Sequence, residues 1–369
     1  MPKKASIFGS YSGHNKGDLA ILFVLLKHLL KSSKGLNLLI PSKRPAKLKK
    51  VLPKFTEHEM VIYKTFTAYW GIGTLKSIAS SDVLVFGGGG LFFDKKFYDP
   101  FSNHVINLFL ITLVNNFFFK KPIYIFSVGA SHLRSKMMLL MTSYILKSAS
   151  RVTVRDHLTA KLFSKHYKRE IKIFYDPAFL LESNIGKTPR IEQFCHQLSA
   201  EKKALFVFNS SFLIRIKKES KTGELVELIN YLQKRYEVVL SSTTTECRLV
   251  DTLASLCEQK SLMVFHPGDI NPEELITFFQ CFDFVICVPM HAAIFSYNAG
   301  IRMITIEYDD KIKAFNRIIG NENSVKIDEL KKIPLYIELY QEIEWNKKKI
   351  IRQNALTNIL KLEEFIYDN

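Results

Sequence analysis

The stretch Val83–Asp94 reads VLVFGGGGLFFD and decides the class of the fold. Its first part is short, apolar and uninterrupted, which predicts a buried strand over Val83–Phe86. Four glycines follow, so the backbone can adopt positive φ there and bring its N–H groups close to a bound molecule. In open α/β sheets such loops lie at the carboxyl ends of strands, where ligands bind. We therefore expect Gly88, Gly89 and Gly90 to contact a substrate; a tight turn without a ligand is the alternative.

Outward from this stretch, short apolar runs alternate with helical patterns. Strand patterns in the first half are Ala5–Gly9, Leu36–Ile40, Ile123–Val128, Arg151–Val154 and Ile171–Phe174, and in the second half Ala204–Phe208, Val238–Ser241, Leu262–His266, Phe284–Val288 and Met303–Ile306. Strands that alternate with helices predict parallel sheets flanked by helices. Two such halves predict an α/β protein with two parallel sheets and a cleft between them.

The length of 369 residues exceeds what one core usually reaches, which also favours two domains. We place the N-terminal domain at residues 1–185 and the C-terminal domain at residues 203–320, with a polar linker between them. Residues 321–369 form a helical segment that can pack back onto the N-terminal domain.

The charge of the chain points to an anionic partner. The sequence has 52 Lys and Arg against 35 Asp and Glu, a formal net charge of +17, and its 47% of hydrophobic residues is typical of a globular protein. The lysines are spread along the chain and no nucleic-acid-binding signature accompanies them, so we expect no nucleic-acid partner. Phosphorylated substrates and acidic lipid headgroups fit the charge.

The cysteines and the N-terminus favour a reducing, cytoplasmic setting. The five cysteines contain no CxxC pair, which suggests neither a zinc site nor a disulfide framework. The start MPKKASIFGSYSG has too few apolar residues for a signal peptide.

The longest apolar stretch is Val105–Phe119, VINLFLITLVNNFFF. It is shorter than a bilayer-spanning helix requires and carries three asparagines. Two interpretations stay open: an ordinary helix buried beside the sheet, or an interfacial helix that presents Phe117–Phe119 next to Lys120 and Lys121 at the inner face of a membrane. The second adds peripheral membrane contact to a cytoplasmic location.

Polar residues follow several of the predicted strands. A single histidine or acid at a strand end is more often structural than functional, but the joint order is more specific. The set is Asn15, Asp18, Asp94, His132, Arg155-Asp156, His291 and Glu307–Lys311. Asn15 or Asp18 can cap a helix over Asp18–Leu30, whose N-terminus favours an anion.

Five segments in this order resemble the polysaccharide pyruvyl transferase family. They are GSYSGHNKGDLAIL, VFGGGGLFFD, VTVRDHLTAKLF, YDPAFLL and PMHAAIFSYNAGIRMITIEYDDKIKAF, and together they span Gly9 to Phe315. The resemblance implies a GT-B-like fold of two Rossmann-like domains with a cleft between them. It also implies transfer of a pyruvyl group from phosphoenolpyruvate onto two sugar hydroxyls as a cyclic ketal. It implies no cofactor beyond this donor, no metal, and a lipid-linked or nucleotide-linked sugar acceptor on the way to a surface or capsular polysaccharide.

The implied chemistry assigns expected roles to the strand-end residues. His291 and Asp94 are the candidate catalytic residues, since a histidine can shuttle a proton near neutral pH. Arg155 and Lys311 can hold the carboxylate and phosphate of the donor by charge-assisted hydrogen bonds. We expect Arg155 and His291 to face one another across the cleft. The expected substrate-binding set is Asn15, Asp18, Gly88, Gly89, Gly90, His132, Arg155 and Lys311.

The sequence departs from the family pattern at two places. The usual Arg-x-His of the second domain reads Pro289-Met290-His291, and the usual Gly-Pro after the fifth strand is Ala130-Ser131. Arg302, Arg134 or another cation can supply the missing contact, or the donor differs, or activity is lost. The alternatives are a GT-B-type glycosyltransferase that uses a nucleotide sugar and a non-catalytic carbohydrate-binding member.

Overall fold

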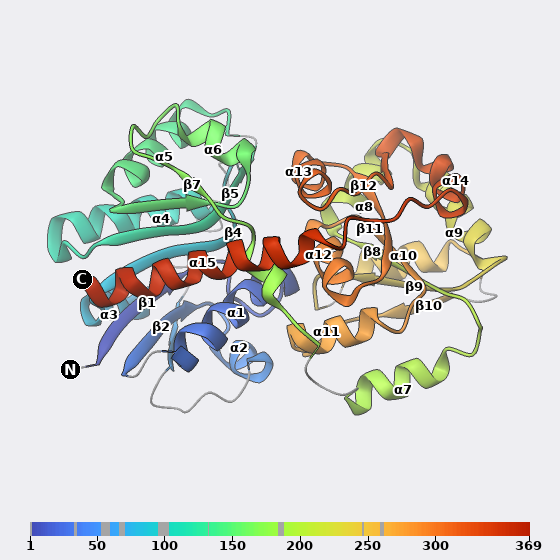
Figure 1. Cartoon of the computed structure of the whole chain (residues 1–369), viewed down its shortest axis with the longest axis horizontal. Helices are drawn as coiled ribbons and strands as arrows, with labels where there is room; N and C mark the ends of the chain where they lie inside the picture. The colour runs from blue at the N-terminus through green and yellow to red at the C-terminus, as the bar shows by residue number, and fades with distance from the viewer. Residues whose placement is uncertain are drawn as a thin grey trace. The chain divides into compact units, whose positions relative to one another are not determined.

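The structure is a computed structural model and describes residues 2–32, 35–52, 60–65, 71–94, 103–131, 133–183, 188–245, 247–258 and 262–369. The chain divides into two compact units. Unit 1 comprises Met1–Leu180 together with Ile351–Asn369, and unit 2 comprises Leu181–Ile350 (Figure 1). Each unit is an α/β sandwich of its own.

Within the described residues, unit 1 is built on a seven-stranded sheet of order β3-β2-β1-β4-β5-β6-β7, and every neighbouring pair is parallel. The strands are β1 (Lys3–Phe8), β2 (Leu36–Ser42), β3 (Met60–Lys64), β4 (Val83–Phe93), β5 (Ile123–Ser131), β6 (Arg151–Val154) and β7 (Lys172–Ile173). The strand order reverses between β1 and β4, which makes their carboxyl ends the expected ligand-binding edge.

The helices of unit 1 are α1 (Lys16–Ser32), α2 (Pro45–Val51), α3 (Ile72–Ser80), α4 (His104–Val114), α5 (Lys136–Ser148) and α6 (His157–Phe163), with a π-helical turn η2 (Asn115–Phe119) and a 3-10 turn η3 (Pro177–Leu180). Val105, Leu108 and Ile111 recur at helical spacing along α4 and are fully buried. They pack with α5 against the apolar residues of β4 and β5, because parallel strands are apolar on both faces.

The last helix, α15 (Lys347–Asp368), packs on unit 1 from Ile351 onward. Its Asn358 Oδ1 accepts a hydrogen bond from the Tyr124 hydroxyl at 3.3 Å, and its Asn354 Oδ1 accepts from the Tyr175 N–H at 2.7 Å. The ring of Phe365 lies edge-on to Tyr124 with the centroids 5.2 Å apart. The C-terminal segment expected over 321–369 is therefore divided, since residues 321–350 belong to unit 2.

The described residues of unit 2 form a six-stranded parallel sheet of order β10-β9-β8-β11-β12-β13. The strands are β8 (Lys203–Phe208), β9 (Glu237–Ser242), β10 (Leu262–Phe265), β11 (Phe284–Cys287), β12 (Arg302–Glu307) and β13 (Ser324–Lys326). This order again reverses, here between β8 and β11.

The helices of unit 2 are α7 (Pro189–Gln197), α8 (Ser210–Lys218), α9 (Thr222–Gln233), α10 (Arg248–Ser255), α11 (Pro272–Phe279), α12 (Met290–Ala299), α13 (Asp310–Ile319) and α14 (Ile333–Glu338), with a 3-10 turn η4 (Ile327–Lys332). One cluster of buried apolar side chains joins α8, α9 and α10 to the sheet, and the stacked rings of Phe206 and Phe208, 4.2 Å apart, lie in it.

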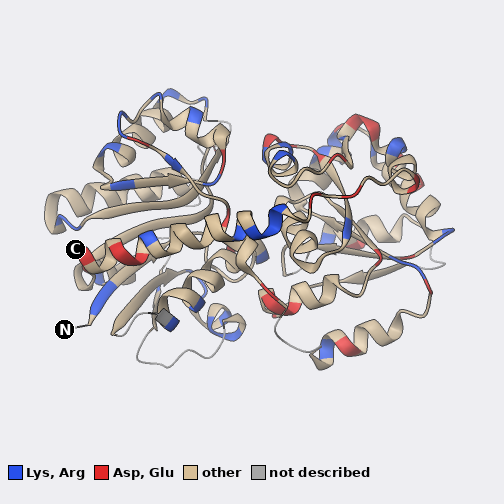
Figure 2. Cartoon of the chain, viewed as in Figure 1, with Lys and Arg blue, Asp and Glu red and all other residues tan. Residues whose placement is uncertain are grey.

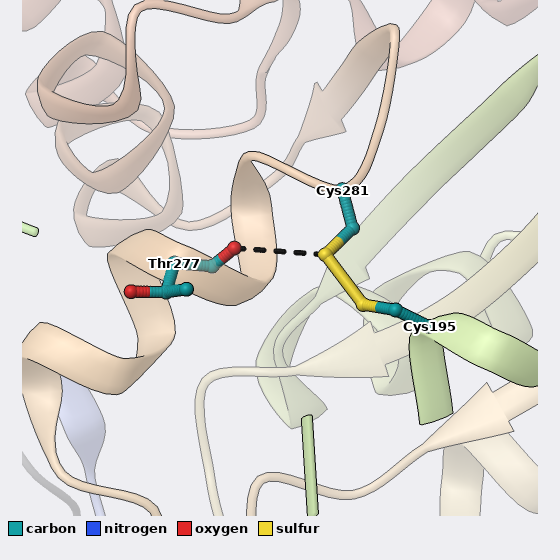
Figure 3. Close-up of a disulfide and its surroundings, with 3 residues drawn as sticks. All are labelled: Cys195, Thr277 and Cys281. Atoms are coloured by element: carbon teal, nitrogen blue, oxygen red, sulfur yellow. Dashed lines mark hydrogen bonds between the residues drawn. A yellow bond between two sulfur atoms is a disulfide. The ribbon is translucent and has the colours of Figure 1, made fainter. Parts of the chain in front are cut away.

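A disulfide joins Cys195 on α7 to Cys281, which follows α11 (Figure 3). The sulfur of Cys281 lies 3.7 Å from the carbonyl oxygen of Thr277. The expectation of no disulfide was wrong for this pair, because 86 residues separate the two cysteines without a spacing signature. The packing of α7 on α11, where Phe194 contacts Phe278 with ring centroids 5.8 Å apart, brings them together.

No helix in the described part of the chain has both the length and the apolar character that crossing a membrane requires. The apolar stretch Val105–Phe119 forms α4 and η2.

Candidate functional site

The glycine run is part of a strand, not of a loop after it. The strand predicted over Val83–Phe86 continues as β4 to Phe93, and Gly89 and Gly90 pair with Val128 and Gly129 of β5. The predicted end of the strand was wrong because glycine carries no side chain that would reveal the alternation or burial of a strand.

The space beside these glycines is filled by side chains of unit 1 itself. Gly88 and Gly89 have φ of +77° and +90°, a backbone conformation that disfavours other residues. A Cβ on Gly88 would lie 2.7 Å from the Tyr11 hydroxyl oxygen and would also overlap Ile21, and a Cβ on Gly89 would lie 2.5 Å from Asp18 Oδ1. The glycines therefore admit α1 and the β1–α1 loop close to β4.

Tyr11 lies at the centre of this arrangement. Its ring is buried, and its hydroxyl donates a hydrogen bond to the Gly87 carbonyl oxygen. Burial raises the pKa of Tyr11 well above its usual value, and the negative charges of Asp18 and Asp176 raise it further. The structure thus places the phenol of Tyr11 and the carboxylate of Asp18 against the glycine run of β4, beside the strand β1 at which the strand order reverses. Sequence reasoning missed Tyr11, whose only signal was its place in the polar loop after β1.

Arg155 is held by a buried ion pair. Its Nη1 lies 2.7 Å from Asp176 Oδ2, and the side chains of both residues are 4% exposed. Its guanidinium packs on Gly129, where a Cβ would lie 2.6 Å from Nε. Asp156 caps α6 through the Thr159 N–H at 2.7 Å. Arg155 therefore has an acidic partner in place, and the role in donor binding stays a prediction.

Asn15 and Asp18 lie at the start of α1. Asn15 Oδ1 accepts a hydrogen bond from the Gly17 N–H at 2.9 Å, and Asp18 approaches Gly89 as described above. Between them Lys16 is completely buried, which is rare for an ammonium group. Lys16 was not among the predicted site residues, although it stands in the same polar loop.

Asp94 lies just past β4, and its carboxylate binds the segment that leads into α5. Asp94 Oδ2 accepts hydrogen bonds from the N–H groups of Arg134 at 2.6 Å and Ser135 at 2.9 Å. Asp94 Oδ1 is buried and has no hydrogen-bond partner among the described residues. Oδ2 of Asp94 thus orders the segment before α5, whereas Oδ1 can accept a proton or a hydrogen bond from a hydroxyl group. The catalytic role of Asp94 stays a prediction. His132 lies outside the described residues.

His291 and Lys311 occupy corresponding positions in unit 2. His291 lies in the first turn of α12, after β11, and Lys311 lies in the first turn of α13, after β12. Asp309 caps α13 by accepting from the Lys311 N–H at 2.9 Å. The helices contact each other and begin at the carboxyl ends of neighbouring strands, so two helix N-termini, a histidine and a lysine share one edge of the sheet. The Asp309 carboxylate already occupies the N-terminus of α13, so the start of α12 and the Lys311 ammonium are the groups of this edge that favour a bound anion.

A phenol and an amide complete this edge. Asn209, after β8, caps α8 through the Phe212 N–H and donates from Nδ2 to the Tyr308 hydroxyl at 2.6 Å. Burial and the neighbouring Asp309 raise the pKa of Tyr308. Sequence reasoning singled out the range Glu307–Lys311 but missed Asn209.

Arg302 lies at the opposite edge of the sheet of unit 2. It is the first residue of β12, whereas Lys311 follows the end of that strand, and its guanidinium stacks on Tyr340 at 4.4 Å from the ring centroid. It lines a cavity of about 220 Å³ with Lys202 and Asp283 at the amino ends of the strands. Arg302 therefore does not take the place of the arginine that the family carries before His291.

Arg155 and His291 belong to different units, and their expected pairing stays a prediction. Among the described residues, no group of three or more His, Cys, Asp or Glu side chains is arranged to hold a metal ion.

Solved structures share the fold of the whole chain. The UDP-GlcNAc 2-epimerase of Methanocaldococcus jannaschii matches with a TM-score of 0.61 and 10% identity over 95% of this chain and 99% of its own. Sucrose-phosphate synthase of Thermosynechococcus elongatus matches with a TM-score of 0.61 and 11% identity, over 99% of this chain and 98% of its own. WaaG, a glycosyltransferase involved in lipopolysaccharide biosynthesis, matches with a TM-score of 0.52 and 13% identity over 98% of this chain and 99% of its own.

These likenesses, with the two parallel sheets, confirm the predicted fold class of two Rossmann-like domains in a GT-B-like fold. No protein with a curated description matches the chain. A family model described as polysaccharide pyruvyl transferase matches residues 15–310, from the start of α1 to the start of α13. The chain therefore belongs to the polysaccharide pyruvyl transferase family.

Proposed function

We propose that this protein transfers the pyruvyl group of phosphoenolpyruvate to two hydroxyls of a sugar and forms a cyclic ketal. The methylene carbon of the donor takes up a proton, and a sugar hydroxyl attacks the resulting cationic carbon and loses its own proton. Phosphate then leaves, and the second hydroxyl attacks the same carbon and closes the ring. The products are one ketal and one phosphate for each donor consumed.

The observation that carries the proposal is the family match, which extends from α1 in unit 1 to α13 in unit 2. The geometry of unit 2 supports the donor. Phosphoenolpyruvate carries a carboxylate and a phosphate, and Lys311 lies at the sheet edge where α12 begins, so a cation and a helix N-terminus are present there. His291 lies at this edge and is our proposed proton donor to the methylene carbon.

Pro289 stands where the family usually carries an arginine, so the positive charge for the donor has to come from another residue. Pro289 precedes α12 and has no side-chain group that could cap this helix, and its carbonyl oxygen accepts a hydrogen bond from the Ala292 N–H at 3.0 Å. Lys311 on the neighbouring helix then supplies the positive charge that the family places on the missing arginine. The donor remains phosphoenolpyruvate in this proposal.

The proposed acceptor is a sugar of a surface or capsular polysaccharide precursor, linked to a lipid or a nucleotide. Unit 1 offers acceptors for sugar hydroxyl protons at the carboxyl edge of its sheet. Asp94 Oδ1 has no hydrogen-bond partner among the described residues, and Asp18 lies beside Gly89 at the start of α1. We propose Asp94 as the base that receives a hydroxyl proton. We propose a cytoplasmic location for the protein.

The test is turnover with defined substrates. The purified chain is incubated with phosphoenolpyruvate and a panel of lipid-linked and nucleotide-linked sugars, and phosphate release and product mass are measured. We expect phosphate to appear with a sugar heavier by one pyruvic acid less one water. Turnover that requires a nucleotide sugar as donor, or saturable glycan binding without turnover across the panel, would contradict the proposal.

A further inference from the structure

The outward face of α4, η2 and α5 is apolar where a surface face is ordinarily polar. Figure 1 shows α4 and α5 next to each other in unit 1. They lie side by side along their length, since Asn103 Nδ2 donates to Met138 Sδ near their first turns and Phe109 contacts Tyr144 midway. We call their outward residues the α4–α5 face; its exposed apolar members are Leu110, Phe117, Phe118, Met137 and Leu140.

Three side chains on this face are largely exposed. Phe117 is 71% exposed, Phe118 78% and Leu140 71%. Leu110 and Phe117 are seven residues apart along α4 and η2, so they lie on the same side. Single exposed apolar residues are ordinary on protein surfaces, whereas a continuous apolar face marks an interaction site.

Two asparagines order the π-helical turn η2, which carries Phe117 and Phe118. Asn115 is buried, donates to the Lys121 carbonyl oxygen at 2.8 Å and accepts from the Lys121 N–H at 3.0 Å. Asn116 donates to the Tyr144 hydroxyl at 3.1 Å and to Ser148 Oγ at 2.8 Å. Both asparagines of the turn thus bind other groups of unit 1, whereas Phe117 and Phe118 are exposed, the reverse of an ordinary solvated turn.

The charges on the segment that carries the face are all positive. From Asn103 to Ser150 the sequence holds five Lys and Arg residues and no Asp or Glu. They are Lys120, Lys121 and Lys147 near the C-terminal ends of the two helices, and Arg134 and Lys136 at the start of α5. In Figure 2 the helices α4 and α5 show no acidic residue.

We propose that the α4–α5 face is a docking surface for an anionic lipid bilayer. Exposed phenylalanines would enter the boundary between headgroups and acyl chains, and the lysines around them would meet the acidic headgroups. A second copy of the chain fits less well, because a two-fold interface through this face would set cations against cations without a carboxylate between them. The inference is independent of the proposed reaction, since it needs neither donor nor acceptor.

The test is vesicle binding by the full chain in the absence of phosphoenolpyruvate and sugars. Vesicles of phosphatidylcholine with and without phosphatidylglycerol are sedimented with the protein at several salt concentrations. We expect binding only to the anionic vesicles, weakened as salt screens the lysines. The F117S/F118S double variant should bind on the order of tenfold less tightly or worse, through lost apolar burial. The K120Q/K121Q double variant should lose about tenfold or more at low salt.

Matched controls separate this face from the general charge and apolarity of the chain. I214S removes an exposed apolar side chain, and K217Q/K218Q removes two exposed lysines, both on α8 of unit 2; each should bind like the unaltered protein. A tryptophan placed by F118W should shift its emission to the blue on anionic vesicles, and one placed by I214W should not. Absence of binding at low salt, equal binding by the F117S/F118S variant, or a dimer that this variant abolishes would overturn the proposal.

Discussion

At the scale of single residues, some polar side chains that were predicted to bind a substrate bind other groups of the protein instead. Arg155 was expected to bind the donor. In the structure its Nη1 lies 2.7 Å from Asp176 Oδ2, and both side chains are buried. The Arg155→Ala change leaves Asp176 buried without that partner, which should cost about 3–5 kcal/mol of unfolding free energy. Urea denaturation measures this loss. The Lys172→Ala change removes one side of an exposed pair with Glu170 and should change stability little. If the Arg155→Ala variant keeps its free energy of unfolding but binds phosphoenolpyruvate more weakly, Arg155 binds the donor and its structural role is contradicted.

Gly88 offers a second test at this scale. Sequence reasoning expected Gly88 to contact a substrate, in which case a side chain here would lower activity and leave the fold intact. Gly88→Ala instead places a Cβ against Tyr11 and Ile21 at a φ of +77°. We expect about 1–2 kcal/mol of destabilisation from the backbone conformation and about 1–3 kcal/mol from the overlap. Thermal unfolding reports it. Gly223→Ala, in α9 with no neighbour within 4 Å of the added Cβ, is the matched control and should not destabilise.

His291 and Lys311 separate chemistry from binding. If His291 donates the proton, His291→Ala should lower kcat on the order of a hundredfold or more with a smaller change in KM. Lys311→Ala should mainly raise KM for phosphoenolpyruvate, because it removes a charge that binds ground state and transition state alike. His196→Ala and Lys313→Ala alter exposed residues of the same types and should leave both constants as they are. Equal effects of the two site variants on KM alone would remove His291 from the chemical step.

At the scale of elements, the disulfide between α7 and the end of α11 is open to a direct test. It closes a separation of 86 residues, and its loss should destabilise unit 2 by about 2–4 kcal/mol. Urea unfolding of the unaltered chain should become easier in dithiothreitol, whereas the C281S variant should unfold early with or without the reductant. A reductant-independent midpoint for the unaltered chain would mean that the two cysteines are not joined in solution.

The elements also show where sequence patterns suffice. Buried strands such as β8 and β11 are apolar on both faces, so a continuous apolar run predicted them without knowledge of their neighbours. The edge strand β3 was not predicted, because its residues are only partly buried and its run is short. The end of β4 was placed too early, since glycines carry no pattern to read.

The candidate site was predictable only in part. Strand-end residues such as His291 and Lys311 could be located, because the carboxyl edge of a parallel sheet follows from the order of the elements. Their partners could not be. The ion pair of Arg155 with Asp176 and the hydrogen bond from Tyr11 to Gly87 depend on packing between segments far apart in the chain.

At the scale of the whole molecule, our central proposal is that residues of both units take part in pyruvyl transfer from phosphoenolpyruvate. The family match runs through both units, and each unit gathers polar side chains at the point where its strand order reverses. The likeness to epimerases and glycosyltransferases stops at the fold, because identities of 10–13% carry no chemistry.

The most direct measurement follows the carbon that is transferred. Phosphoenolpyruvate labelled at its enolic carbon with a heavy isotope of carbon is mixed with the purified chain and the sugar panel, and the label is traced by NMR and mass spectrometry. The account predicts that the labelled carbon moves into a ketal bonded to two oxygens of one sugar, with one phosphate released per ketal. It also predicts that the His291→Ala variant slows this transfer. Label that stays in phosphoenolpyruvate or appears only as free pyruvate with every sugar, in the presence of folded protein, would contradict the account.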